Sequence, residues 1–233
     1  MLRRPSNVAV ITADIIGSTQ YQPRERARIT QQLHQAFALV SKQYAPAVHT
    51  PATFRITAGD EFQWVISSPA TAFEIVLFLR SIVAAIKAKP LVTFRASIGV
   101  GAMTVAGGKS SYEKDGPAFV RSRLGLTFLA KRRTRWTTLV TDDPSTDKAA
   151  DAVLTLLDSF QQRWTRSQWE AVRWALAGLN RTEIAAKLHV AHQSASKRLI
   201  AAEWDAFIVG FRFVGELVDS AHSATRAQQL PAS

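Results

Sequence analysis

The chain has 233 residues and a formal net charge of +11, and this length suits two domains of average size. Hydrophobic residues make up 47% of the chain and charged residues 20%, which excludes wholesale disorder. The chain has no cysteine, which excludes a disulfide framework, a thiolate metal site and a cysteine nucleophile, and favours a reducing, cytoplasmic location.

The apolar run from Val8 to Ala13 predicts a buried strand, and the spacing of Ile29, Leu33 and Phe37 predicts a helix over residues 24–44. Later runs predict strands at 54–57, 62–66, 92–100 and 136–141, and helices at 69–87 and 117–133. A further helix follows the turn-forming residues 142–145. The order β-α-β-β-α-β-α-β-α predicts an α/β (α+β) sandwich with helices covering a mixed sheet, related to the ferredoxin-like arrangement.

Strand signals end after about residue 160, and helices separated by Thr165, residues 178–180 and residues 189–191 follow. We therefore expect an α/β domain over 1–150, a helical domain over 151–222 and a flexible tail over 223–233. No stretch approaches the roughly 18 apolar residues of a membrane span, and the start of the chain lacks the apolar centre of a secretory signal. We expect no contact with a membrane.

The basic surplus lies in the predicted α/β domain. Residues 1–150 hold 20 of the 29 Lys and Arg residues and 10 of the 18 Asp and Glu residues, so residues 151–233 are nearly neutral. Such a surplus favours a polyanionic partner, although a general solubility bias explains it equally well. One basic cluster follows the predicted helix at 117–133, where cations also stabilise a helix end; it consists of Lys131, Arg132, Arg133 and Arg135.

Two carboxylates are candidates for a binding site in the α/β domain. Asp14 stands where the first strand meets a turn of small residues, and Asp60 lies on the predicted hairpin between the strands at 54–57 and 62–66. If these strands neighbour the first, both carboxylates meet at one sheet edge, where they would bind a hard cation and, through it, a nucleotide. Taken singly, Asp14 is also a helix N-cap and Asp60 a turn residue.

Four short motifs in order carry a family resemblance. ADIIGST (13–19) resembles the first metal-binding segment of the class III nucleotidyl cyclases, and AGDEF (58–62) resembles their second segment and the signature of diguanylate cyclases. Together with RASIGVG (95–101) and DGPAF (115–119), the set is similar to the SatD family of bacterial proteins over roughly residues 7–200. The resemblance implies a nucleotidyl cyclase-like fold for the first domain.

The cyclase resemblance implies that Asp14 and Asp60 bind Mg²⁺ or Mn²⁺. It also implies a phosphate cradle formed by the backbone of Ile15, Ile16, Gly17, Ser18 and Thr19. Cyclases carry a base-reading lysine four residues before the second aspartate, but Ile56 stands there, with Arg55 beside it as the nucleotide-binding candidate.

The later helix also departs from the cyclase pattern. Arg123 matches the cyclase arginine that steadies the transition state, but Phe119 occupies the place of the ribose-positioning asparagine. Loss of one such donor costs about 10²–10³ in rate. The residues therefore favour binding of a nucleotide or cyclic nucleotide over its formation, and the alternatives are an active cyclase and a relic site retained for its fold.

The segment from Arg181 to Trp204 has the spacing of a helix-turn-helix. Ala185 supplies the small residue where two helices cross, and Val190 supplies the apolar residue after the turn. His189 stands where glycine is usual, because the turn often needs a positive φ angle, which histidine tolerates better than bulky branched residues. The segment looks like the DNA-reading unit of bacterial regulators.

By this resemblance, the second helix would contact the major groove or its phosphates, with glutamine suited to adenine and basic side chains suited to phosphate or guanine. The candidate DNA-binding residues are His192, Gln193, Ser194, Ser196, Lys197 and Arg198. The alternative is a helical hairpin used for dimer contacts. The near-neutral charge of residues 151–233 argues against DNA.

The apolar segment after Glu203 places Phe207, Phe211 and Val214 on one helical face. Such a face needs a partner surface, so we expect a homodimer that reads a two-fold operator; the alternative is that this helix packs on the first domain. The preferred interpretation is a cytoplasmic DNA-binding transcriptional regulator with a degenerate cyclase-like nucleotide-sensing domain. The alternative is an active class III-type nucleotidyl cyclase regulated by its C-terminal helices.

Overall fold

The computed structural model describes residues 6–45, 47, 55–56, 60–105 and 114–228. Its elements are, in chain order, β1 (Ser6–Ile15), η1 (Ser18–Gln20), α1 (Pro23–Gln43), β2 (Arg55–Ile56), β3 (Glu61–Ile66), α2 (Pro69–Ala84), β4 (Phe94–Val105), β5 (Lys114–Asp115), α3 (Pro117–Ala130), β6 (Thr137–Val140), α4 (Pro144–Arg163), α5 (Arg166–Leu176), α6 (Arg181–Leu188), α7 (His192–Ala201) and α8 (Trp204–Gln228). The prediction of a mixed α/β fold is confirmed, with a short extra strand, β5, and with β4 reaching five residues beyond its expected end.

The sheet has the order β2-β3-β1-β4-β5, and β6 pairs in parallel with β4. β1 lies between β3 and β4 and is antiparallel to both. This central position follows from the sequence, since residues 8–13 form an apolar run that is buried on both faces. β1 thus delivers Asp14 to the sheet end where it pairs with Glu61 of β3 and Arg95 of β4.

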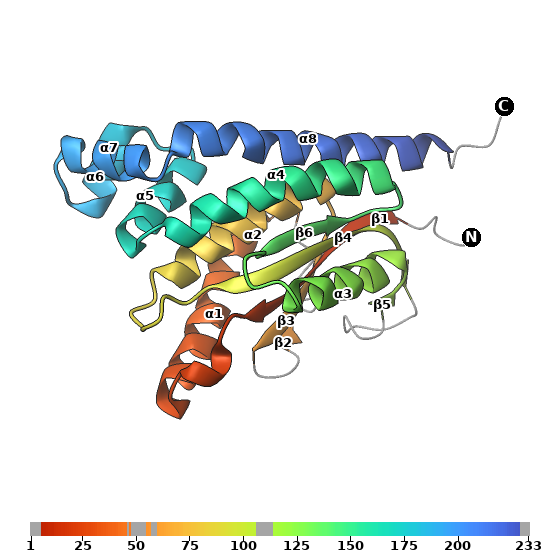
Figure 1. The fold of residues 1–233 in the computed structure, drawn as a ribbon, viewed down its shortest axis with the longest axis horizontal. Coiled ribbons are helices and arrows are strands. Elements are labelled where there is room, and N and C mark those ends of the chain that lie inside the picture. Colours follow the sequence, from red (N-terminus) through yellow and green to blue (C-terminus); the bar gives the residue numbers. More distant parts are fainter. Residues whose placement is uncertain (1–5, 46, 48–54, 57–59, 106–113, 229–233) are drawn as a thin grey trace.

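Helices cover both faces of the sheet (Figure 1). Alternate residues of β1 supply the two faces: Ile11 and Ile15 join the large core with α1 and α2, whereas Val8 and Val10 join a smaller core under α3. On the large-core face, Phe37 of α1 contacts the ring of Trp64 edge-on at a centroid distance of 5.0 Å. The alternate residues of β1 and the residues spaced by three or four in α1 therefore pack in the same core.

Two side chains of opposite charge, Arg80 and Asp158, are buried beneath this core. Arg80 of α2 is fully buried and donates to Gln161 Oε1 at 2.6 Å and to the Phe94 carbonyl at 3.0 Å. Asp158 of α4 is equally buried and accepts from the amide of Thr137 at 2.9 Å. Burial lowers the pKa of Arg80 to about 10, and Asp158 opposes that shift. The pair links α2, α4 and β6.

The C-terminal helices pack directly on the α/β part. Figure 1 shows α8 lying along α4, and α5 and α8 also contact α2. Arg166 of α5 donates to the carbonyls of Ile86 and Ala88 beyond the end of α2, both at 3.1 Å, and the ring of Phe211 of α8 stacks on Phe73 of α2 at 4.8 Å. α2 is therefore shared between the sheet and the helices that follow it.

Two expected boundaries look different in the structure. α4 runs from Pro144 to Arg163 without a break, so the boundary expected at residue 150 lies inside this helix. α8 continues to Gln228, so residues 223–228 of the expected flexible tail are helical, and 229–233 lie outside the described residues. The expected helix limits at Thr165 and Asn180 agree with the structure, because both side chains cap helices: Thr165 caps α5 and Asn180 caps α6.

Candidate functional sites

The turn after β1 contains the residues that were expected to form a phosphate cradle. Gly17 has φ 67 and ψ 30, a left-handed conformation that glycine adopts freely, and it starts η1. The amide of Ile15 donates to the carbonyl of Asp60 at 3.0 Å, and the amide of Ile16 donates to the carbonyl of Thr93 at 2.9 Å. Because these two amides already donate within the chain, a phosphate would have to be bound by the amides of Gly17, Ser18 and Thr19.

The structure places Asp60 beside this turn. The hydroxyl of Ser18 donates to Asp60 Oδ2 at 2.5 Å, and the backbone bond from Ile15 holds the same residue. The expected neighbourhood of the first strand and the hairpin is therefore present. Residues 57–59 lie outside the described residues, and Arg55 is placed only by its backbone, opposite Gln63 of β3.

Asp14 has a partner of its own. Arg95 donates to both carboxylate oxygens, from Nη2 to Oδ2 at 2.6 Å and from Nε to Oδ1 at 3.2 Å. Burial raises the pKa of Asp14 above its ordinary value, and Arg95 opposes that rise while the negative charges of Asp60 and Glu61 add to it. Asp14 and Asp60 are thus close enough to interact electrostatically.

As arranged, these carboxylates do not fit a divalent cation. Both oxygens of Asp14 accept from Arg95, and one oxygen of Asp60 accepts from Ser18. Over the part of the chain that the structure describes, no three His, Asp or Glu side chains gather as metal ligands. Binding of Mg²⁺ or Mn²⁺ stays a prediction that requires Arg95 to release Asp14.

The residues of α3 that correspond to cyclase residues have structural partners. Arg123 forms an ion pair with Glu61 of β3, with about half of its side chain exposed. Phe119 is 9% exposed and belongs to the small core under α3. The apolar side chain at this position therefore packs against the sheet. In the basic cluster after α3, Arg135 is buried and pairs with Asp151 at 2.5 Å, whereas Lys131, Arg132 and Arg133 are exposed.

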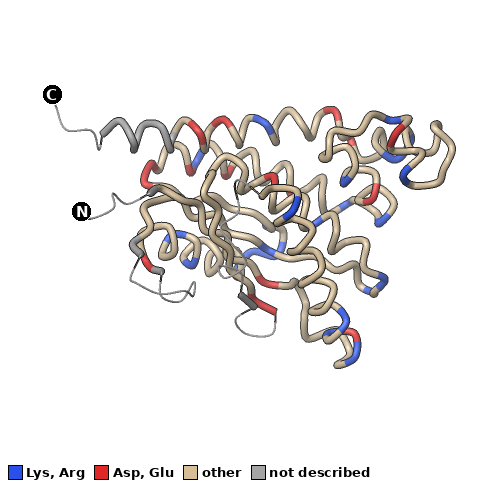
Figure 2. Tube along the Cα trace, turned by 180° about the vertical axis from the view of Figure 1, so that it is seen from behind, with Lys and Arg blue, Asp and Glu red and all other residues tan. Residues whose placement is uncertain are grey.

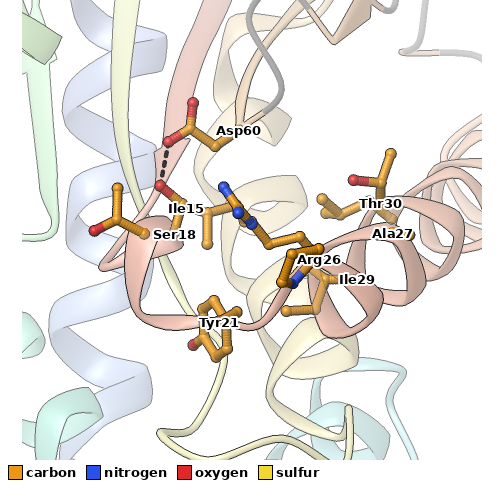
Figure 3. Close-up of a pocket in the computed structure, with 11 residues that line it drawn as sticks. Ile15, Ser18, Tyr21, Arg26, Ala27, Ile29, Thr30 and Asp60 are labelled. Atoms are coloured by element: carbon orange, nitrogen blue, oxygen red, sulfur yellow. Dashed lines mark hydrogen bonds between the residues drawn. The ribbon is translucent and has the colours of Figure 1, made fainter.

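A cavity of about 520 Å³ opens beside the same turn. Its lining residues come from the end of β1, η1, the first half of α1 and the hairpin: Ile15, Ser18, Thr19, Tyr21, Pro23, Arg26, Ala27, Ile29, Thr30, Leu33 and Asp60. Figure 3 shows the Arg26 side chain extending from α1 across the cavity toward Ser18 and Asp60. The sequence did not single out Arg26, because Arg24 and Arg28 stand at equivalent alternate positions.

The two helices of the expected DNA-reading unit are present at the expected residues. His189 ends α6 with φ 53 and ψ 46, the left-handed conformation that the missing glycine would have supplied. The amide of Val190 donates to the carbonyl of Ala185 at 3.0 Å, which closes the turn. Ala185 and Ala195 are buried where the helices meet.

The candidate DNA-binding residues of α7 divide into two groups. His192, Gln193, Ser194 and Lys197 are exposed. Ser196 accepts a hydrogen bond from Arg181 at 3.1 Å, and Arg198 donates to Glu170 at 3.4 Å. Figure 2 shows basic and acidic segments interspersed over α5, α6 and α7, in agreement with their small net charge.

The apolar face of α8 is covered by the chain itself. Phe207, Phe211, Val214 and Val218 are buried, and α8 packs on α2 and α4. The alternative that this helix packs on the first domain therefore describes the structure. The homodimer stays a prediction, but the unburied face that suggested it is absent from the described part of α8. Among the described helices, none is long and apolar enough to cross a membrane.

The fold and these two sites define a mixed α/β protein whose C-terminal helices include two short helices around a tight turn. The sequence matches the SatD family over residues 7–212, so the chain belongs to the SatD family, as the motifs indicated. Among solved structures, a bacterial light-regulated adenylyl cyclase is similar, with a TM-score of 0.38 and 14% sequence identity. The match covers 58% of this chain and 43% of the cyclase chain, less than two thirds of its length. No curated protein matches the sequence.

Proposed function

We propose that the protein is a DNA-binding transcriptional regulator whose α/β part binds a nucleotide without cyclising it. One observation carries the proposal: α7 follows a tight turn, buries Ala195 and Leu199, and exposes Gln193 and Lys197. A helix that enters the major groove needs this division, with small apolar residues inward and polar residues outward.

The exposed residues of α7 suit readout of a DNA duplex. An amide such as that of Gln193 pairs with the N6 and N7 edge of adenine, and Lys197 suits a phosphate or guanine. Arg198 would join them by exchanging Glu170 for a phosphate, since their contact is long at 3.4 Å. The low net charge of residues 151–233 predicts weak non-specific binding, so selective binding would depend on the base contacts of α7.

The sensing part of the proposal is supported by the turn after β1. The left-handed Gly17 and the start of η1 present backbone amides beside Asp60, and such a turn suits phosphate oxygens. The contact of Asp14 with Arg95, the burial of Phe119 and the contact of Arg123 with Glu61 favour binding over cyclisation. In each case, a residue at a position that the cyclases use for catalysis is instead held in a structural contact.

α2 provides the connection between sensing and DNA binding. It contacts α1, which lines the cavity, and it contacts α5 and α8, which carry the two short helices. The hydroxyl of Tyr44, after the end of α1, donates to Glu74 of α2 at 2.9 Å. A ligand that favours one position of α1 would therefore bias α2, provided that it binds the two arrangements unequally.

The test is fluorescence anisotropy of the full chain with duplexes from the DNA upstream of its own coding sequence. We expect specific binding that Gln193→Ala and Lys197→Ala each weaken by about 5-fold to 100-fold. Lys148→Ala, on the exposed start of α4, removes the same charge far from α7 (Figure 1) and should leave affinity unchanged. Specific binding that survives the combined Gln193→Ala and Lys197→Ala changes would exclude α7 as the reading helix.

The cyclase alternative is tested separately. The chain is incubated with ATP or GTP and with Mg²⁺ or Mn²⁺, and the products are separated by chromatography. We expect no cyclic product above the level of the Asp14→Ala variant. Robust turnover that Asp14→Ala abolishes would favour the cyclase over the regulator and show that the protein is an enzyme.

A further inference from the structure

The cavity between η1 and α1 has the size and lining of a small-molecule site. Its volume of about 520 Å³ lies within the range of ligand pockets, about 300–1,000 Å³. Ile29, Leu33 and Tyr21 are buried side chains that give it an apolar floor. Ser18, Thr30 and Asp60 supply hydrogen-bonding groups at its rim. A flat ring with polar edges suits such a lining.

The charges on the cavity limit what can bind there. Arg26 extends across it (Figure 3), and within the described residues no carboxylate forms an ion pair with Arg26. Asp60 is the acidic side chain of the lining, and Ser18 holds one of its oxygens. Arg24 and Arg28 are exposed on α1 and do not line the cavity. The lining thus carries one cation and one carboxylate, which together are neutral.

A neutral lining disfavours a ligand with a high negative charge. A nucleoside triphosphate carries several negative charges at neutral pH and would face the carboxylate of Asp60 without a metal ion to offset them. Asp14, the other carboxylate expected to hold that metal, does not line the cavity and is bound by Arg95. A cyclic phosphodiester carries a single negative charge, so it can bind the Arg26 guanidinium with much less repulsion from Asp60 than a triphosphate would meet.

We propose that this cavity binds a nucleoside cyclic monophosphate, with Arg26 binding the phosphodiester and the apolar floor holding the base. The proposal rests on the proposed nucleotide sensing and names its ligand class. Asp60 accepts a hydrogen bond from the ligand with its free oxygen, which favours a base or sugar that presents a donor. Binding needs no divalent cation.

The test is calorimetry of the full chain with 3′,5′-cyclic AMP, GMP, CMP and UMP, and with ATP and GTP, each in EDTA and in Mg²⁺. We expect at least one cyclic nucleotide to bind equally in both conditions and more tightly than either triphosphate. Arg26→Ala should weaken that binding by about 10-fold to 100-fold, since it removes a charged hydrogen-bond donor. Arg28→Ala removes the same charge from the same helix outside the cavity and should leave affinity within about 2-fold. Ala27→Trp, which fills the cavity from an exposed position, should abolish binding.

Three results would overturn the proposal. Tighter binding of a triphosphate, above all one that requires Mg²⁺, would show that the ligand class is wrong while nucleotide sensing stands. Equal affinity of the wild-type and Arg26→Ala chains for a cyclic nucleotide would show that Arg26 does not bind the ligand and that the cavity is not its site. Absence of binding by every nucleotide would remove the sensing function as well, and the anisotropy experiment would decide separately whether DNA binding stands.

Discussion

Arg95 Nη2 lies 2.6 Å from Asp14 Oδ2, across the central strand pair β1 and β4. Both side chains are about one-fifth exposed, so the pair is neither a free surface ion pair nor a fully buried one. Burial raises the pKa of Asp14 and Arg95 opposes that rise. The arginine therefore stabilises the charged form of a partly buried carboxylate, against the effect of burial, at the position where the cyclase pattern expects a metal ion.

Removal of Arg95 should destabilise the chain because it leaves the Asp14 charge without a partner. We expect Arg95→Met to lower the free energy of unfolding by about 1–2 kcal/mol, between the values for exposed and buried pairs, and to raise the pKa of Asp14 further. Urea unfolding monitored by tryptophan fluorescence gives the free energy. The Arg95→Met, Asp14→Asn double variant should be less destabilised than Arg95→Met; equal losses would show that the pair contributes only through packing.

The buried pair of Arg80 and Asp158 should matter more for stability. Arg80→Met removes a fully buried cation together with its hydrogen bonds to Gln161 and the Phe94 carbonyl, and one such loss costs about 3–5 kcal/mol. The double variant Arg80→Met, Asp158→Asn removes both of these charges. Arg135 then loses its contact with Asp158 at 3.8 Å but keeps its pair with Asp151, so part of the stability should return. Urea unfolding of the three chains compares these values. A loss below about 1 kcal/mol for Arg80→Met would mean that water reaches the pair.

Local patterns predicted the elements but not these pairs. The apolar run at 8–13 and the spacing of Ile29, Leu33 and Phe37 are visible within a few neighbouring residues, and they correspond to β1 and α1. The contact of Asp14 with Arg95 depends on the register between strands 81 residues apart, which no local pattern contains. The burial of Arg80 likewise depends on partners from distant segments, Gln161 of α4 and Phe94 of β4.

The candidate site was only partly visible for the same reason. The sequence predicted that Asp14 and Asp60 lie at one sheet edge, because the turn and the hairpin each have a characteristic composition, but it did not predict the contact of Ser18 with Asp60. Arg26 could not be distinguished from Arg24 and Arg28, because only the docking of α1 on the sheet decides which one faces the cavity. Whether α8 packs on the first domain or on a second chain could not be predicted, because the answer depends on the surface of α2. In the structure, Phe73 of α2 stacks on Phe211 of α8.

Two phenylalanines of α8 separate intramolecular packing from self-association. Phe211 is buried against Phe73, so Phe211→Ala should cost about 3–5 kcal/mol of stability. Phe213 is 44% exposed, and Phe213→Ala should change stability by less than about 0.5 kcal/mol. Light scattering after size exclusion gives the mass of each chain. If the predicted homodimer uses the outer face of α8, Phe213→Asp should shift it toward monomer, and an unchanged dimer would place the interface elsewhere.

Replacement of His189 by glycine should make the chain more stable. Its φ of 53 places a side chain in the left-handed region, which glycine occupies without steric cost. We expect His189→Gly to raise the free energy of unfolding by about 0.5–1 kcal/mol and His189→Val to lower it. DNA affinity in the anisotropy experiment should stay the same for His189→Gly, because the turn keeps its shape. A large loss of affinity would instead assign the imidazole a contact with DNA.

Asp143 should make the stability of the α4 start depend on pH. Its side chain accepts hydrogen bonds from Thr146 and Ser145, which lower its pKa from 3.8 to about 2. A carboxyl whose pKa is lower in the folded chain stabilises the fold above its ordinary pKa, so this contribution is full above pH 3.8 and is lost as the pH falls toward 2. Asp143→Asn keeps an acceptor for the helix amides but does not titrate. Urea unfolding at a series of pH values should therefore show the wild-type chain more stable than Asp143→Asn at neutral pH, with the difference shrinking between pH 3.8 and about 2. A constant difference over that interval would show that the hydroxyl and amide donors bind the neutral acid as well as the carboxylate.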